Sequence, residues 1–178
     1  MRSALPKALH VIGGRTLLAH VLTAAKQAGG AAIAVVVGPD HDTVAAEARA
    51  LAPDAEIFEQ AQRRGTAHAV LSARKAIERR PDDILVMFGD TPLVRPQTLR
   101  DLRAALEKGA AVAVLGFRPE NPAGYGRLVM RGDQLLAIRE ERDATPQERT
   151  IGLCNGGLMA LSGKTALVIL DRINNDNA

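Results

Sequence analysis

The chain has very few aromatic side chains: no tryptophan, one tyrosine and three phenylalanines, or 2% of its 178 residues. That composition leaves few rings on which nucleic-acid bases could stack. The 23 basic and 20 acidic residues give a net charge of only +3, and the charges are dispersed rather than gathered into a basic patch. We therefore expect no nucleic-acid partner. The small net positive charge fits a small anionic substrate better.

Cysteines and long hydrophobic runs are scarce too. The single cysteine, Cys154, excludes an internal disulfide and fits a reducing cytoplasm. It lies in an apolar stretch, so we expect a small buried packing residue rather than a nucleophile. No apolar run approaches the roughly 18 residues of a spanning helix, and no charged and then apolar leader opens the chain. We expect a soluble, cytoplasmic protein without a membrane partner.

The apolar content that is present is aliphatic. Alanine, valine and leucine supply nearly all of the 47% apolar residues, which is typical of a parallel sheet flanked by alanine-rich helices. Helical spacing marks residues 16–27, 42–51, 69–77 and a segment between Pro92 and Lys108. Short apolar runs predict strands at 33–37, 55–58, 84–88 and 111–115, with 84–88 a buried parallel strand. The alternation predicts an α/β fold with a doubly wound, mostly parallel, Rossmann-like sheet.

The pattern changes after residue 115. A loop bracketed by glycines at 121–127 leads into two apolar runs separated by Gly132-Asp133, which predicts a β-hairpin insertion near 121–138. The charged stretch 140–143 is interpreted as a solvated loop, and a final apolar segment at 151–161 precedes a helical tail at 167–173. No linker divides the chain, so we predict a single domain over 1–178.

Asp90 stands at the C-terminal end of the strand predicted at 84–88. Open α/β sheets bind ligands at the carboxyl ends of their strands. A carboxylate there, in a loop fixed by Gly89 and Pro92, suits a Mg²⁺ ion that carries phosphates, because hard oxygen ligands match this ion. The alternative is that Asp90 only caps the next helix.

Two other loops carry polar candidates. Lys7 follows Pro6 in a rigid loop, where it can meet a phosphate as a compact point charge; an ordinary solvated lysine is the alternative. The loop 60–68 turns at Gly65 and opens into a helix, so its polar groups can hold an anion or read the edge of a base. His68 has no other ligand at suitable spacing beside it, and we favour a structural role for it. The residues alone predict a protein that binds a phosphorylated small molecule.

Six segments, in order along the whole chain, resemble one family. They are residues 1–14, Gln60 with 65–69, 88–93, 121–127, Glu140 with 143–145, and 155–157. The first resembles the signature loop of sugar-nucleotide pyrophosphorylases. Together they resemble the N-acetylglucosamine-1-phosphate uridylyltransferase domain, the N-terminal half of the bacterial bifunctional enzyme that makes UDP-N-acetylglucosamine. The resemblance implies a nucleotide-diphospho-sugar transferase fold.

The resemblance also implies an enzyme, a nucleotidyltransferase that joins UTP and N-acetylglucosamine-1-phosphate to give UDP-N-acetylglucosamine and pyrophosphate. This product serves the synthesis of peptidoglycan in the cell wall and of lipopolysaccharide. No covalent intermediate is needed, so positioning and charge neutralisation by Mg²⁺ would carry most of the catalysis. Matched to the family motifs, the implied catalytic residues are Lys7 for phosphate oxygens and Asp90 for Mg²⁺, and the implied substrate residues are Gln60, Gly65 and Thr66 for uracil and Gly124, Glu140 and Asn155 for the sugar.

The chain departs from the family pattern at both ends. In the family, an apolar strand and a glycine-rich phosphate cradle precede the position of Met1. Beyond the stretch Asn174 to Asn177, the family continues into a second metal ligand and a left-handed β-helix with an acetyltransferase site. We therefore expect a domain that is incomplete at both ends, with neighbouring strand edges exposed, and any homo-oligomer to form through the absent C-terminal half.

Two alternative functions stay open at this point. One is a related nucleotidyltransferase with another nucleotide or acceptor, such as an enzyme of the molybdenum cofactor. The loop with Gln60 and Gly65-Thr66 argues against it, and competition of UTP with GTP and CTP would discriminate the two. The other is a non-catalytic fragment that at most binds a nucleotide-sugar, which the missing phosphate cradle favours.

Overall fold

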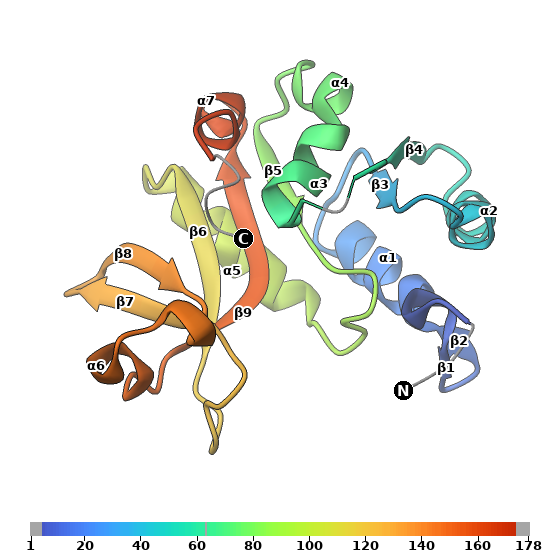
Figure 1. Cartoon of the computed structure of the whole chain (residues 1–178). Helices are drawn as coiled ribbons and strands as arrows, with labels where there is room; N and C mark the ends of the chain where they lie inside the picture. Colours follow the sequence, from blue (N-terminus) through green and yellow to red (C-terminus); the bar gives the residue numbers. More distant parts are fainter. Residues whose placement is uncertain (1–4, 63, 174–178) are drawn as a thin grey trace. The chain divides into compact units, whose positions relative to one another are not determined.

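The computed structural model describes residues 5–62 and 64–173. The chain divides into two compact units, one of Met1–Ala113 with Ala160–Ala178 and one of Val114–Met159 (Figure 1). The start of the family signature, residues 1–4, and the asparagine-rich stretch 174–177 lie outside the described residues. Whether the chain acts as a single domain stays a prediction.

The first unit holds most of the helices. Its elements, in chain order, are η1 (Lys7–Leu9), β1 (Val11–Ile12), β2 (Arg15–Thr16), α1 (Leu17–Gln27), β3 (Ala34–Val37), α2 (Asp42–Leu51), β4 (Glu56–Glu59), α3 (Thr66–Ser72), α4 (Arg74–Ile77), β5 (Asp83–Val86), α5 (Pro96–Glu107) and α7 (Ala166–Leu170). The second unit holds β7 (Arg127–Arg131), β8 (Gln134–Arg139), η2 (Glu141–Asp143) and α6 (Pro146–Arg149). Strands β6 (Val112–Phe117) and β9 (Cys154–Ser162) each run from one unit into the other.

The strands form three sheets. Strands β1 and β2 make a small antiparallel hairpin, and β3 and β4 pair in parallel with Ala34 opposite Glu56. The third sheet has the order β5-β9-β7-β8, with β6 beside β9. Among the described residues β3 pairs only with β4 and β5 only with β9, so each has one edge without a neighbouring strand.

Local signals in the sequence set the first helix and its surroundings. The Thr16 hydroxyl accepts a hydrogen bond from the Ala19 N–H at 3.1 Å and so caps α1. The helix ends before Gly29, whose φ of +91° few other residues adopt. Between β1 and β2, Gly13 and Gly14 both have positive φ, which a tight two-residue hairpin turn requires.

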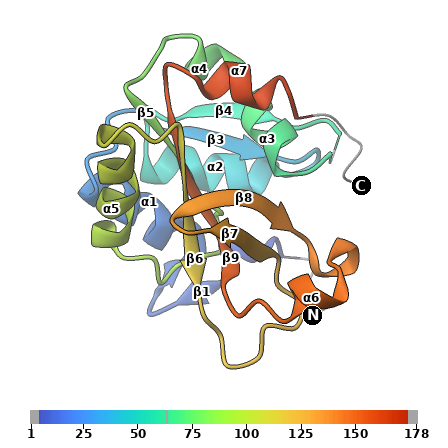
Figure 2. The ribbon, with the colours of Figure 1, turned by 90° about the vertical axis from the view of Figure 1, so that its left-hand side faces the viewer.

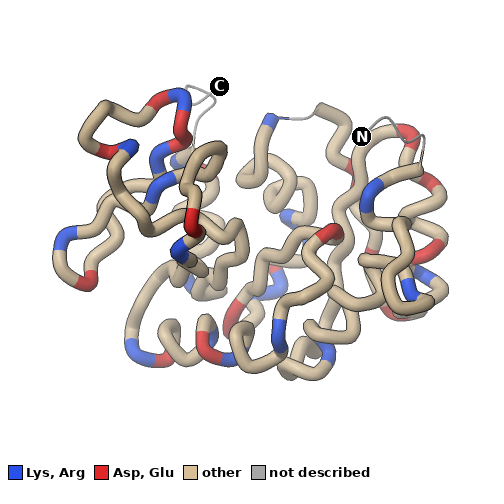
Figure 3. Tube along the Cα trace, turned by 90° about the horizontal axis from the view of Figure 1, so that it is seen from below, with Lys and Arg blue, Asp and Glu red and all other residues tan. Residues whose placement is uncertain are grey.

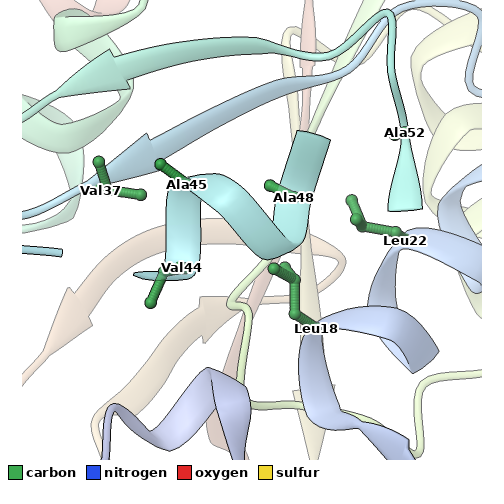
Figure 4. Close-up of a cluster of buried hydrophobic side chains, with 7 residues drawn as sticks. All are labelled: Leu18, Leu22, Val37, Val44, Ala45, Ala48 and Ala52. Atoms are coloured by element: carbon green, nitrogen blue, oxygen red, sulfur yellow. The ribbon is translucent and has the colours of Figure 1, made fainter. Parts of the chain in front are cut away.

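The aliphatic core predicted from composition is confirmed. Helices α1 and α2 face one another with small side chains between them, and β3 adds Val37 (Figure 4). The buried members are Leu18, Leu22, Val37, Val44, Ala45, Ala48 and Ala52. Each fully buried leucine or valine contributes about 1.5–3 kcal/mol, and the alanines allow the two helices to approach closely.

Three predicted elements differ from the structure. The predicted buried strand 84–88 is β5 (Asp83–Val86), whose four residues are half-buried rather than buried and which pairs with one neighbouring strand, β9. The predicted helix 69–77 begins earlier, at Thr66, and breaks at Ala73, whose ψ of +24° leaves the helical region and separates α3 from α4. The predicted tail helix 167–173 is shorter, since α7 ends at Leu170.

The predicted hairpin is confirmed. Strands β7 and β8 pair antiparallel with Arg127 opposite Arg139, and α6 lies against β7 (Figure 2). The turn uses Gly132 at φ +58°. Basic and acidic residues are interspersed along the described chain without a long segment of one sign (Figure 3). None of the helices in residues 5–62 and 64–173 has the length and apolar character needed to cross a bilayer.

Candidate functional site

Asp90 lies in a tight turn just beyond β5. Thr91 closes this turn through two bonds to the Phe88 carbonyl, from its N–H at 3.3 Å and from its hydroxyl at 2.8 Å. The next helix, α5, begins at Pro96 with Arg95 in the N-cap position. The alternative reading of Asp90 as a helix cap is therefore wrong, and its carboxylate is exposed to solvent.

Lys7 begins the short turn η1, directly after Pro6. Pro6 has φ −53° and ψ 138°, and the Lys7 carbonyl accepts a bond from the His10 N–H at 3.0 Å. This turn packs against the Asp90 turn, since a Cβ atom at Gly89 would lie 3.5 Å from the Ala8 Cβ. The structure therefore brings together the segments that carry Lys7 and Asp90. The contact itself is made by their neighbours Ala8 and Gly89.

The described part of the chain contains no group of three or more histidine, cysteine, aspartate or glutamate side chains that could hold a metal ion. Asp90 instead offers one exposed carboxylate. Mg²⁺ commonly keeps several waters and binds through one or two carboxylates together with substrate phosphates. Asp90 therefore fits a Mg²⁺ ion that arrives with a nucleotide, and does not fit an all-protein cage.

Gln60 extends the edge of β4. Its N–H donates to the Val37 carbonyl at 2.8 Å, which continues the ladder with β3. Its side-chain Nε2 lies 3.1 Å from the Gly65 carbonyl oxygen and 3.1 Å from Nδ1 of His68. Gly65 has φ +91°, and the exposed Thr66 follows it as the first residue of α3. The three predicted uracil-reading residues are thus parts of one closed loop.

His68 is a residue whose role the sequence did not reveal. It lies in the first turn of α3 and is half-buried, with its ring against the Gln60 amide. The sequence favours a structural role for His68 but does not predict Gln60 as its partner. The available signal was the distance of three residues from Gly65, which places His68 over the loop once the helix begins at Thr66.

The remaining predicted residues lie in the second unit, around Gly126. The Asn155 N–H donates to the Gly126 carbonyl at 2.8 Å. A Cβ atom at Gly126 would lie 3.2 Å from Oε1 of Glu140, so the Glu140 carboxylate covers the bare backbone there. Gly124, in the same loop, has φ +85° and open space where a side chain would begin. The structure therefore brings Gly124, Glu140 and Asn155 together.

An ion pair between Arg127 and Glu141 stabilises the loop around Gly126, and the sequence does not indicate this pair. Arg127 is 1% exposed, and its guanidinium donates to the Tyr125 carbonyl and to Oε1 of Glu141, the latter at 3.3 Å. The other oxygen of Glu141 accepts from the Gly124 N–H. The interpretation of 140–143 as a solvated loop is therefore wrong at Glu141, because Arg127 is buried and needs a counter-charge.

The Tyr125 ring anchors the same loop from another direction. It meets Phe117 edge to face, with ring centroids 4.9 Å apart and an interplanar angle of 89°. Such pairs contribute about 0.5–1.5 kcal/mol beyond the area they bury. The candidate residues thus form two groups, one in each unit: Lys7, Gln60, Gly65, Thr66 and Asp90 in the first, and Gly124, Glu140 and Asn155 in the second.

Comparison with solved structures identifies the fold. The chain superposes with a TM-score of 0.75 on UDP-glucose pyrophosphorylase complexed with UDP-glucose, at 16% identity, covering 97% of this chain and 74% of the other. It superposes with a TM-score of 0.74 on CMP:2-keto-3-deoxy-manno-octonic acid synthetase complexed with CTP, at 20% identity and the same coverage. The predicted α/β fold of nucleotide-diphospho-sugar transferases is confirmed.

Comparison with other sequences gives much higher identities. The chain is 60% identical to the bifunctional protein GlmU of Azorhizobium caulinodans and 61% identical to that of Xanthobacter autotrophicus, in both cases over all 178 residues. It spans 40% of the length of each relative. The family model of the MobA-like NTP transferase domain matches residues 1–151. The chain belongs to the family of MobA-like NTP transferase domains.

Proposed function

We propose that the chain transfers a uridylyl group from UTP to N-acetylglucosamine-1-phosphate, giving UDP-N-acetylglucosamine and pyrophosphate. The observation that carries the proposal is the grouping of the candidate residues. The residues assigned to phosphate lie on two segments in contact, those assigned to uracil form one loop of the same unit, and those assigned to the sugar lie around Gly126 in the other unit. The resemblance to the uridylyltransferase domain and the high identity to GlmU proteins support this assignment.

The reaction is a displacement at the α-phosphorus of UTP. A phosphate oxygen of the sugar phosphate forms the new bond to this phosphorus, and the bond to the oxygen that bridges to the β-phosphate breaks. Pyrophosphate leaves with the electron pair of the broken bond. Such transfers depend on positioning and charge neutralisation rather than on a protein nucleophile, which agrees with the buried state of Cys154.

The residues of the chain divide this work between them. Lys7 contributes a positive charge next to the phosphates, and Gln60 with the Gly65 loop holds the base. Asp90 would hold Mg²⁺, which when bound neutralises charge on the phosphates. Nucleotidyl and phosphoryl transfers generally rely on a divalent cation, and we propose that this cation is Mg²⁺. Because the Gly124 N–H already donates to Glu141, it is not available to the sugar while that bond holds.

The test is pyrophosphate release from UTP and N-acetylglucosamine-1-phosphate with Mg²⁺, measured on this chain beside the longer Azorhizobium caulinodans relative. UTP should be turned over in preference to GTP and CTP. Release by this chain supports the proposal in full. UTP binding without release by this chain, while the relative is active, assigns it a nucleotide-binding role. Preference for GTP or CTP in both proteins refutes the uridylyl assignment.

Asp90 provides a sharper test within the same assay. Asp90→Asn keeps the size of the side chain and removes the negative charge that a divalent cation requires, so we expect Mg²⁺-dependent turnover to be lost. Asp133→Asn, in the exposed hairpin turn of the second unit, is the matched control and should keep full activity. Turnover by Asp90→Asn at the control rate would remove Asp90 from the site.

We also propose a cytoplasmic location. A fully buried free thiol at Cys154 is compatible with the reducing conditions of that compartment. The proposed substrate UTP is also available there. Fractionation of cells that express the chain, followed by immunodetection, tests this assignment. Recovery mainly with membranes or in the culture medium would contradict it.

A further inference from the structure

The orientation of the Gln60 side chain is determined by its neighbours. A backbone carbonyl can only accept hydrogen bonds, so the Gln60 atom that faces the Gly65 carbonyl must be the amide nitrogen, which is a donor. This nitrogen carries two hydrogens. The second faces Nδ1 of His68 at 3.1 Å, so Nδ1 is the acceptor and the proton of the neutral imidazole lies on Nε2.

With both amide hydrogens engaged, one polar atom of Gln60 is left for a ligand. That atom is Oε1, which can only accept. Uracil presents an N–H donor at ring position 3, and cytosine presents a bare nitrogen acceptor at the same position. At ring position 3, an amide oxygen therefore pairs with uracil and faces a repulsive acceptor in cytosine. Pairing with cytosine at this position would require the amide to turn over, with loss of its bonds to both Gly65 and His68.

We propose that His68 is a positioning residue that fixes the Gln60 amide with its oxygen towards the base and thereby selects uracil over cytosine nucleotides. The backbone of His68 is itself held in α3, where its carbonyl accepts from the Ser72 hydroxyl at 3.1 Å. The inference rests on the proposed role of Gln60 as a base-reading residue. It adds a group that does not touch the nucleotide but decides which atom of Gln60 meets it.

Two variants separate the acceptor at position 68 from the bulk of the ring. His68→Phe keeps a ring of similar shape and removes the acceptor. His68→Asp removes the ring and places an obligate acceptor oxygen as many bonds from the backbone as Nδ1 of histidine. The probes are UTP and CTP, each titrated into the chain by calorimetry with Mg²⁺, and the readout is the ratio of the two dissociation constants. A general loss of affinity cancels in that ratio.

In His68→Phe, turning the amide costs one hydrogen bond fewer than in the parent chain. A hydrogen bond of this kind contributes about 0.5–1.5 kcal/mol net, so we expect the preference for UTP over CTP to fall about two- to thirteenfold. In His68→Asp the preference should stay within about twofold of the parent value. Gln60 and His68 are only half-buried, so water can replace part of a lost hydrogen bond. The change in the UTP-to-CTP preference should therefore stay well below the discrimination between substrates that a water-free site achieves.

An independent measurement tests the geometry without nucleotide. Nitrogen-15 NMR of the histidine side chains, with His68→Phe used for assignment, should show that the neutral ring of His68 carries its proton on Nε2. A proton on Nδ1 would overturn the inference, as would an unchanged UTP preference in a folded His68→Phe. A parent chain that binds neither UTP nor CTP would refute the proposed function as well, and so is distinguishable from a failure of His68 alone.

Discussion

Removing the carboxylate of Glu141 should destabilise the protein far more than removing an exposed partner of another arginine. The side chain of Arg127 is 2% exposed and that of Glu141 36% exposed, with 3.3 Å between the guanidinium and Oε1. In Glu141→Ala, the buried guanidinium keeps the Tyr125 carbonyl as its partner and loses its counter-charge. A buried charge without a partner is one of the few defects that cost several kcal/mol.

The magnitude follows from the distance and the exposure. At 3.3 Å and an effective dielectric constant of about 20, the attraction between unit charges is about 5 kcal/mol. Breaking fully buried pairs costs about 3–5 kcal/mol, and the partial exposure of Glu141 lets water replace some of the lost interaction. We therefore expect Glu141→Ala to lower the free energy of unfolding by about 2–4 kcal/mol. For a chain of this length, that lowers Tm by roughly 5–15 °C.

The assay is urea unfolding followed by circular dichroism, with three variants. Asp171→Ala is the matched control, because the Arg74–Asp171 pair is 41% and 48% exposed, and it should cost less than about 1 kcal/mol. Glu141→Gln keeps an acceptor for the Gly124 N–H and should fall between the two. If Glu141→Ala costs no more than Asp171→Ala, the reasoning about a buried, dependent guanidinium is refuted.

Three further predictions test other parts of the structure. Gly163→Ala should cost about 2–4 kcal/mol in urea unfolding, because a Cβ there would lie 1.6 Å from the Pro81 carbonyl oxygen and the backbone would have to move. Hydrogen bonding from the Thr145 backbone lowers the pKa of Glu148 in the folded protein. The charged Glu148 carboxylate therefore stabilises the fold at pH values above its unfolded pKa. Glu148→Gln should be less stable than the parent there, and this difference in unfolding free energy should disappear as the pH falls through the folded pKa. Cys154 is fully buried and should react with Ellman's reagent only at the rate of unfolding.

Each of these has its own control. Gly89→Ala would place a Cβ at ordinary contact distances of 3.5 and 3.6 Å, so it should cost less than about 1 kcal/mol; equal losses in the two glycine variants would contradict the steric argument. A Glu148→Gln deficit that persists at acid pH would exclude the linkage. Rapid labelling of Cys154 in native buffer would show that the thiol is accessible.

Much of the fold could be predicted because its signals are local. The helical spacing over residues 16–27 predicts α1 to within one residue of its observed bounds, Leu17–Gln27. The hairpin of β7 and β8 follows from its turn residues. The burial predicted for residues 84–88 is wrong because the burial of a strand depends on its neighbours in the fold, and no pattern within 84–88 encodes those neighbours.

The candidate site shows the same division between local and distant information. The order of the motifs named Lys7, Gln60, Asp90 and Asn155 as candidates, since each lies in a short segment that resembles a family signature. The sequence could not show that Gly126 lacks a side chain to make room for the Glu140 carboxylate. That contact joins two segments of the second unit that are separated by an entire hairpin.

The sequence by itself determined the class of fold, the aliphatic core and the motif residues, because helix spacing, caps and turns depend on neighbours within a few positions. Only the tertiary structure decided that the His68 ring contacts the Gln60 amide and that Arg127 takes Glu141 rather than Glu140 as its partner. Adjacent glutamates are indistinguishable in a charged stretch. Their roles separate only when the backbone directs one carboxylate over Gly126 and the other towards a buried guanidinium, since the energy of a charge depends on burial and distance.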